Sequence, residues 1–116
     1  MDFGLNGKTA LVLGGGGGLG RAIAKALAAE GAKVAAADIS AEAAAATRDA
    51  IGGKSLALEW DLADLAKIDA HVSKVEAALG PVDILVNNTG GPPPTPAAGQ
   101  DPALWTRQFQ SMVLSV

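Results

Sequence analysis

The sequence of 116 residues has no cysteine and no tyrosine, and it has a single histidine, His71. Without cysteine the chain can form neither disulfides nor thiolate metal sites, which is typical of a protein from a reducing compartment. His71 has no second histidine to complete a metal site. We therefore predict no metal-binding residues and expect His71 at the surface of a helix.

Basic residues are also too few for a nucleic-acid interface. The chain has nine Lys and Arg residues and twelve Asp and Glu residues, so its net charge is −3. No segment of the sequence concentrates the basic residues into a patch. The N-terminus, Met1 to Lys8, has no apolar segment of the kind found in signal peptides. The longest uncharged stretch, near Thr9 to Gly20, is dominated by glycine and does not resemble a membrane span. We expect a cytoplasmic protein with no nucleic-acid or membrane partner.

Alanine, other aliphatic residues and glycine make up most of the chain. Hydrophobic residues account for 49% of the sequence and aromatic residues for 3%, so the core is aliphatic. Apolar runs bounded by glycine alternate with segments of helical periodicity, which predicts an α/β protein of one domain. The predicted strands are Lys8–Leu13, Lys33–Ala37, Ser55–Trp60 and Val82–Val86, and the predicted helices are about Leu19–Glu30, Ala41–Ile51, a third ending near Leu79 and a last one opened by Asp101-Pro102.

This alternation indicates a parallel sheet with helices on both faces. Right-handed crossovers then give the strand order 3-2-1-4 of a Rossmann-type doubly wound sheet. The last helix carries an apolar stripe of Trp105, Phe109, Met112 and Val116, for which packing is the simplest role. Because the chain ends inside that stripe and leaves the fourth strand with an open edge, we expect a truncated sheet whose remaining strands are missing.

The five consecutive glycines at positions 14 to 18 fit two phosphate-binding patterns. One uses Gly14, Gly18 and Gly20, and the other uses Gly15, Gly17 and Gly20. Both place glycines where a strand turns into a helix, so the backbone can approach a diphosphate and the helix N-terminus offers free N–H groups. A glycine run matches many patterns, and a plain flexible turn is the alternative. Its position between a strand and an amphipathic helix favours dinucleotide binding.

Asp38 closes the second predicted strand, 18 residues after Gly20. A carboxylate at this position can accept hydrogen bonds from both hydroxyl groups of an adenosine ribose and would repel a 2′-phosphate. Neither the glycine turn nor position 39, which is Ile39, supplies a basic residue to pair with that phosphate. The sequence therefore predicts NAD rather than NADP, with a solvated loop acid as the alternative role for Asp38.

Three segments carry a family resemblance. The segment from Ala10 to Ala24 resembles the opening of the short-chain dehydrogenases/reductases, Asp61-Leu62 resembles their adenine-pocket pair, and Asn87-Asn88-Thr89-Gly90 resembles their signature after the fourth strand. The resemblance extends from Gly4 to Val116 and is strongest to 3-oxoacyl-(acyl-carrier-protein) reductase-like members. It identifies residues 1–116 as the N-terminal part of a dinucleotide-binding Rossmann domain.

The resemblance implies a role for each matching residue. Asp38 would bind the ribose, Asp61 and the Leu62 backbone would flank the adenine, and Asn88 and Gly90 would line the path to the nicotinamide ribose. Asp61 could instead be only a cap of the third helix, and Asn88 only a turn former. The phosphates would lie on Gly14, Gly17, Gly18, Leu19 and Gly20, which selects the first glycine register.

The resemblance also implies an activity: hydride transfer between a nicotinamide cofactor and a carbonyl compound or secondary alcohol, with 3-oxoacyl thioester reduction as the nearest case. The family acts as homo-oligomers, which predicts a dimer or tetramer whose interface includes the last helix. A non-catalytic dinucleotide-binding module or sensor is the alternative.

The sequence departs from the family at three points. Leu13 stands where the family usually has a threonine, which predicts a mobile turn that has lost a side-chain hydrogen bond. Met112 stands at the position of the catalytic asparagine and cannot relay a proton. The catalytic serine, tyrosine and lysine of the family would lie beyond Val116, so we assign no catalytic residue and expect the 116-residue chain alone to be inactive.

Overall fold

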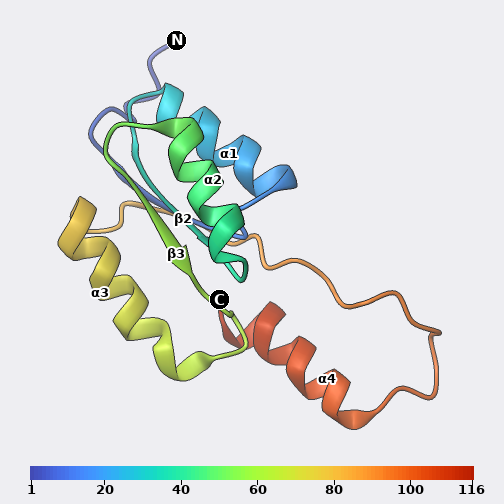
Figure 1. Ribbon diagram of the computed structural model, residues 1–116. Coiled ribbons are helices and arrows are strands. Elements are labelled where there is room, and N and C mark those ends of the chain that lie inside the picture. The colour runs from blue at the N-terminus through green and yellow to red at the C-terminus, as the bar shows by residue number, and fades with distance from the viewer.

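The computed structural model describes all residues from Met1 to Val116, and in it strands and helices alternate along the chain (Figure 1). A 3₁₀ turn at Leu65–Lys67 precedes the third helix, and a π-helical turn at Gln110–Leu114 follows the fourth. None of the helices is both long and apolar enough to cross a bilayer. The strands are β1 (Thr9–Leu13), β2 (Lys33–Asp38), β3 (Ser55–Glu59) and β4 (Ile84–Val86), and the helices are α1 (Gly18–Ala29), α2 (Ala41–Ile51), α3 (Ile68–Leu79) and α4 (Pro102–Phe109).

The four strands form one parallel sheet in the order β3-β2-β1-β4, which confirms the predicted Rossmann-type topology. In the central strand, Ala10 is paired with Val34 of β2 on one side and with Ile84 of β4 on the other. Because all four strands run in the same direction, their carboxyl ends lie along one edge of the sheet. The segments that follow β1, β2, β3 and β4 are therefore brought together at that edge.

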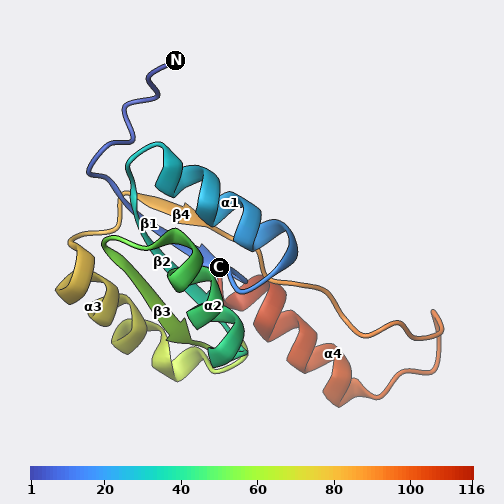
Figure 2. The same ribbon diagram turned by 45° about the horizontal axis from the view of Figure 1, so that its top comes forward.

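The sheet is covered by helices on both faces, α1 and α2 on one and α3 on the other (Figure 2). Side chains alternate between the two faces of a strand. Ala10 and Val12 of β1 accordingly belong to a cluster with Ala24 of α1, whereas Leu11 and Leu13 belong to a second cluster that includes Val75 and Leu79 of α3. The buried core is aliphatic apart from Trp60. It holds the strand ends at fixed positions.

Short side chains and a glycine mark the helix ends. The Ser40 hydroxyl accepts a hydrogen bond from the Ala43 N–H at 3.1 Å and so caps α2. Asp101 caps α4 in the same way, accepting from Ala103 N–H at 2.8 Å, and Pro102 occupies the first helical position. Gly80 ends α3 with a φ of 98°. The helix boundaries predicted by residue lie within one residue of the observed ones.

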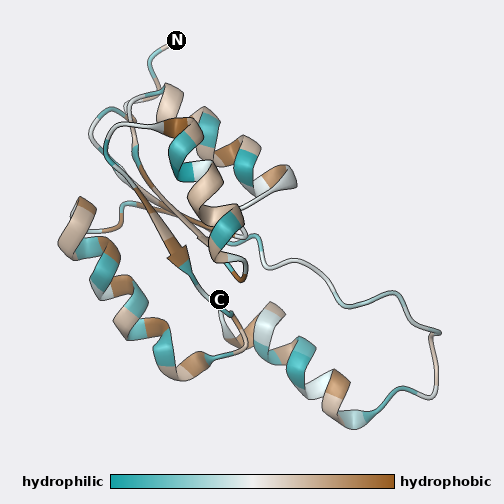
Figure 3. Ribbon diagram, viewed as in Figure 1, coloured by the Kyte–Doolittle hydropathy of each residue, from teal (hydrophilic) through white to brown (hydrophobic).

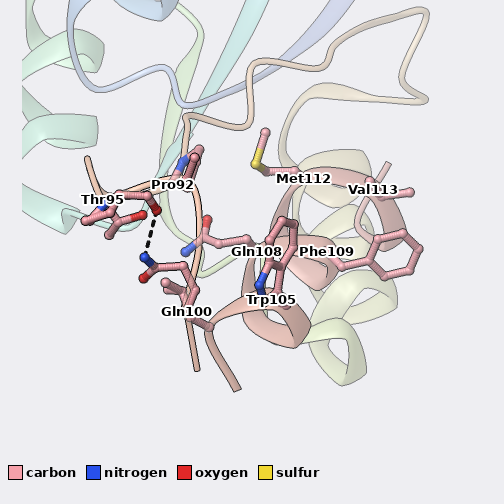
Figure 4. Close-up of a pocket in the computed structure, with 11 residues that line it drawn as sticks. Pro92, Thr95, Gln100, Trp105, Gln108, Phe109, Met112 and Val113 are labelled. Atoms are coloured by element: carbon pink, nitrogen blue, oxygen red, sulfur yellow. Dashed lines mark hydrogen bonds between the residues drawn. The ribbon is translucent and has the colours of Figure 1, made fainter. Parts of the chain in front are cut away.

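The C-terminal segment lies beside the sheet edge rather than over a face. An extended loop leads from β4 to α4, and brown apolar segments are visible on this last helix (Figures 1 and 3). The aromatic residues of the apolar stripe do not pack against the rest of this chain, since Trp105 is 66% exposed and Phe109 is 53% exposed. Together with Met112 and Pro92 of the loop, these side chains line an apolar hollow of about 370 Å³ (Figure 4).

Candidate functional site

A polar cavity of about 340 Å³ lies at the carboxyl edge of the sheet, where Rossmann-type folds bind their ligands. Its walls come from the segments after all four strands and from one side of α4. Six of the residues predicted from the sequence lie here, and the other four, Gly17 to Gly20, form the start of α1. The lining residues are Gly14, Asp38, Ile39, Trp60, Asp61, Leu62, Asn88, Thr89, Gly90, Arg107, Gln108 and Ser111.

The turn between β1 and α1 closes on itself at two glycines. Gly14 has a φ of +62°, a conformation that side-chain-bearing residues rarely adopt. A Cβ atom on Gly20 would fall on the carbonyl oxygen of Gly14, and a Cβ on Gly14 would fall on the backbone oxygen of Asn88. The turn therefore needs glycine at both positions because the backbone segments approach too closely for a side chain. This is the spacing of the first of the two predicted registers.

The first turn of α1 leaves its N–H groups available to a ligand. Gly17 is the N-cap residue and has no side chain, so no cap hydrogen bond forms, and the first turn contains no acidic residue. Gly18 and Leu19 are exposed at the mouth of the turn. Because the first four N–H groups of a helix have no partner within the helix, this end of α1 can accept an anion.

Four side chains bind the glycine turn. The Thr47 hydroxyl donates to the Gly15 carbonyl at 2.8 Å, and the Arg21 guanidinium donates to the Gly16 carbonyl at 2.5 Å. Asp38 accepts from the Gly16 N–H at 3.0 Å, and the Asn88 amide donates to the Gly14 carbonyl at 3.3 Å. Leu13 itself gives the turn no side-chain hydrogen bond, as predicted, but Arg21 of α1 and three residues more distant in the sequence bind the turn instead.

Asp38 is held in one orientation at the end of β2. One carboxylate oxygen accepts from Gly16 N–H and the other from the Ser40 N–H, each at 3.0 Å. A carboxylate oxygen has two lone pairs, so both oxygens keep an acceptor site free. The side chain lines the cavity and is partly exposed. Asp38 can therefore accept two hydroxyl groups from a diol without rearrangement of the protein.

Asp61 forms an ion pair with Arg107, a residue that no sequence pattern singles out. Its Oδ2 lies 3.3 Å from the Arg107 guanidinium of α4, and its Oδ1 accepts from the Ala63 N–H at 2.9 Å. The N-cap residue of α3 is Lys67, so Asp61 is not the cap of that helix. Both partners are half exposed, and pairs of this kind contribute little to stability. The ion pair joins the Arg107 side chain of α4 to the cavity wall.

Asn88 connects the β4 end to the glycine turn. Its side-chain amide donates to the Gly14 carbonyl, and its backbone oxygen lies against Gly14, so the two segments are in direct contact. Thr89 and Gly90 continue along the cavity wall. Asn88 thus does more than form a turn, because it helps fix the carbonyl group at which the glycine turn begins.

Trp60, which lines the cavity, stacks on His71 of α3, which does not. Their ring centroids are 4.6 Å apart with an interplanar angle of 24°, and Trp60 is 4% exposed. His71 is partly exposed on α3, where Trp60 covers one face of its ring and its Nδ1 is buried. Burial lowers the pKa of His71 below its usual range, and the neighbouring Lys74 and Lys67 ammonium groups lower it further. His71 is accordingly neutral near pH 7.

The residues present fit an adenine dinucleotide. The edge offers an uncapped helix start that could receive a diphosphate, a carboxylate with two hydrogen bonds, Asp38, that could accept a ribose diol, and a second carboxylate, Asp61, in the cavity wall. The cavity also contains the hydroxyl groups of Thr89 and Ser111 and the amide of Gln108. The chain contains no tyrosine, and the neutral His71 does not line the cavity.

Comparison with known proteins agrees with this geometry. A family profile described as short chain dehydrogenase matches residues 8–116. Sorbitol dehydrogenase of Cereibacter sphaeroides is 50% identical over 84 residues, covering 72% of this chain and 33% of the relative. The 3-oxoacyl-(acyl-carrier-protein) reductase of Escherichia coli (strain K12) is 46% identical over 90 residues, covering 78% of this chain and 36% of the relative.

Solved structures share the fold of this chain. The 3-ketoacyl-(acyl-carrier-protein) reductase from Brucella melitensis, crystallised in complex with NADH, superposes with a TM-score of 0.89 and 38% identity. The match covers 96% of this chain and 46% of that one. The chain therefore spans about a third of the length of the curated relatives it matches and about half of that structure.

Proposed function

The chain belongs to the short-chain dehydrogenase family, and on that premise we propose that it is the cofactor-binding portion of an NAD(P)-dependent oxidoreductase. In this proposal residues 1–116 are the N-terminal part of the dinucleotide-binding domain, and the catalytic part lies outside them. The observation that carries the proposal is the closed glycine turn. It sets the uncapped start of α1 beside Asp38, at the edge where all four strands end.

Each part of the cofactor has a group to hold it. The N–H groups around Gly17, Gly18 and Leu19, with the close turn at Gly14 and Gly20, would receive the diphosphate. Asp38 would bind the adenosine ribose, which favours NAD over NADP because a 2′-phosphate would meet its negative charge. The sides of the cavity would hold the ends of the cofactor: Asp61 and Leu62 the adenine, and Asn88 and Gly90 the nicotinamide ribose.

The cofactor, when bound, supplies the hydride for a carbonyl group or accepts it from a secondary alcohol. The residues of this chain orient it and exclude water from part of its surface. The relatives include a 3-oxoacyl-(acyl-carrier-protein) reductase and a sugar-alcohol dehydrogenase, and both names describe interconversion of a carbonyl group and an alcohol. We therefore place the substrate in the class of small carbonyl compounds or secondary alcohols, with a 3-oxoacyl thioester as the nearest case.

Proton transfer must come from residues outside this segment. Met112, at the predicted relay position, lines the apolar hollow instead of the polar cavity, and a thioether cannot exchange a proton. A tyrosine followed four residues later by a lysine, in the continuation of the gene, would supply the missing acid or base. The whole protein is then expected to act in the cytoplasm as a homo-oligomer, a dimer or a tetramer.

The test compares two proteins, residues 1–116 and the full-length gene product, by absorbance at 340 nm with NADH and a panel of 3-oxoacyl thioesters and ketones. We expect turnover by the full-length protein and none by residues 1–116, because these residues include no tyrosine to exchange the substrate proton. Cofactor binding by the full-length protein without turnover of any substrate would favour a non-catalytic module or sensor. Turnover by residues 1–116 would show that the chemistry lies within this segment.

A further inference from the structure

Thr47 and Arg21 lie outside the predicted site but bind the glycine turn directly. Thr47 is on α2, fully buried, and its hydroxyl donates to the Gly15 carbonyl at 2.8 Å. Arg21 is on α1, and its Nη2 donates to the Gly16 carbonyl at 2.5 Å. The two side chains also bind each other, since the Arg21 Nε donates to the Thr47 hydroxyl at 3.0 Å. Two successive carbonyl groups of the turn are thus held by one connected pair.

Peptide geometry links these carbonyl groups to the N–H groups that follow them. A trans peptide unit is planar, and its C=O and N–H bonds point in opposite directions. The Gly15 carbonyl shares its peptide unit with the Gly16 N–H, which donates to Asp38 at 3.0 Å on the other side of the turn. Thr47 and Asp38 therefore hold opposite ends of one peptide unit and fix its plane.

The next peptide unit is held at one end only. Arg21 binds the Gly16 carbonyl, and the Gly17 N–H of the same unit must point away from Arg21. No side chain and no turn carbonyl accepts that N–H. A Cβ placed on Gly17 would have no protein atom within 4 Å, so the space around Gly17 is open to a ligand. Arg21 thus directs a free N–H group into open space beside the start of α1.

We propose that Thr47 and Arg21 are positioning residues for the cofactor: by holding the Gly15 and Gly16 carbonyl groups, they direct the Gly17 N–H at the bound diphosphate. An unrestrained glycine peptide can rotate until its carbonyl oxygen faces the site. A carbonyl dipole facing a diphosphate repels it, whereas an N–H group attracts it. Glycine would allow the peptide unit to face the site with its carbonyl group or with its N–H group. Thr47 and Arg21 therefore select the orientation in which the N–H group faces the anion. This inference rests on the proposed function, since it assumes that the turn binds a dinucleotide.

Two nitrogens of the Arg21 guanidinium, Nε and Nη2, take part in this role. Besides the Gly16 carbonyl and the Thr47 hydroxyl, the guanidinium group reaches the Ala43 carbonyl of α2 at 3.5 Å. A planar fork of donors can hold several acceptors at once, which a lysine ammonium on a flexible stem cannot reproduce. Arg21 therefore acts through the backbone and is not expected to pair with a 2′-phosphate.

The experiment measures binding of two ligands to the full-length protein and its variants by calorimetry: NAD, which carries the diphosphate, and adenosine, which does not. In Thr47→Val the hydroxyl is lost without a change of size. We expect the Kd for NAD to rise by about tenfold, the effect of leaving a buried polar partner unsatisfied, while the Kd for adenosine changes by less than about threefold. Thr47→Ser keeps the hydroxyl and is expected to bind NAD like the unchanged protein.

Matched variants separate positioning from stability. Thr106→Val removes a threonine hydroxyl that binds a helix carbonyl on α4, away from the turn, and is expected to leave both Kd values unchanged. Arg21→Lys keeps the charge but loses the planar fork of donors, so it is expected to weaken the binding of NAD and not that of adenosine. Arg48→Lys, on the exposed side of α2, is expected to leave the binding of both ligands unchanged. If Thr47→Val does not fold, as judged by circular dichroism, the Kd values of Arg21→Lys and Thr47→Ser for NAD and adenosine test the inference in its place.

An unchanged ratio of the NAD and adenosine Kd values in Thr47→Val or Arg21→Lys would overturn the inference. A lowered Tm with that ratio unchanged would do so as well, since it would show a structural role only. Failure of the proposed function has a different signature, because the unchanged protein would then bind no NAD at all.

Discussion

Replacing Gly20 by alanine is expected to abolish cofactor binding by the full-length protein. On helix propensity alone this change would stabilise α1 by about 1 kcal/mol. The new Cβ would, however, fall on the carbonyl oxygen of Gly14, which belongs to the backbone and cannot move aside as a side-chain end can. Overpacking of this kind costs about 1–3 kcal/mol. The turn must therefore open, and we expect the affinity for NAD to fall by at least about a hundredfold.

Gly17→Ala is the matched control for this prediction. Gly17 has an extended backbone with a φ of −165°, and a Cβ there would contact no protein atom. Its Tm should therefore equal that of the unchanged protein, whereas Gly20→Ala should melt at a lower temperature. Thermal denaturation and NAD titration of both variants check this. Gly20→Ala protein that binds NAD with unchanged affinity would show that the close approach of Gly14 and Gly20 does not form the site.

Replacing Asp38 by alanine is expected to reverse or erase the preference for NAD over NADP. The carboxylate offers two free acceptor sites to a ribose diol, and hydrogen bonds to a charged group contribute about 1.5–3 kcal/mol each. Loss of one or both of these hydrogen bonds should weaken NAD binding by about tenfold to a hundredfold or more. NADP should bind no worse and is expected to bind better, because its 2′-phosphate no longer meets a negative charge.

The selectivity, defined as the ratio of the NADP and NAD Kd values, is the quantity to measure. Asp38 also accepts the Gly16 N–H, so its removal loosens the turn for both cofactors, and the ratio cancels that effect. Glu59 is the matched control, since it is paired with Asp38 in the sheet register but is exposed and does not line the cavity. Glu59→Ala should keep the original ratio. An unchanged ratio in Asp38→Ala would remove Asp38 from the ribose site.

The sheet could be predicted from the sequence because the signals for each strand and helix lie within or next to that element and recur along the chain. Apolar runs, glycine stops and capping residues such as Ser40 mark each element where it lies in the chain. Parallel connections then leave few possible strand orders. The π-helical turn after Phe109 was not predicted, since the spacing of Trp105, Phe109 and Met112 suits an ordinary helix. The exposure of that stripe depends on where a long loop places α4, which periodicity cannot determine.

The candidate site was predictable where it follows a strand end and not where it depends on contacts between helices. Gly14 and Asp38 stand directly after buried strands, and the sheet edge brings them together. Thr47 looks like a polar residue within an alanine-rich helix, and its partner Arg21 is 26 residues away. Arg107 and Asp61 are 46 residues apart. No local pattern relates such pairs, so only the folded structure shows that they meet.

The claim that the turn after β1 receives a dinucleotide is tested most directly by titrating the folded, full-length protein with NAD in a calorimeter. The account predicts a saturable heat of binding at one site per chain, lost in Gly20→Ala and competed by adenosine. A folded protein that gives no binding heat with NAD or NADP at millimolar concentration would contradict it.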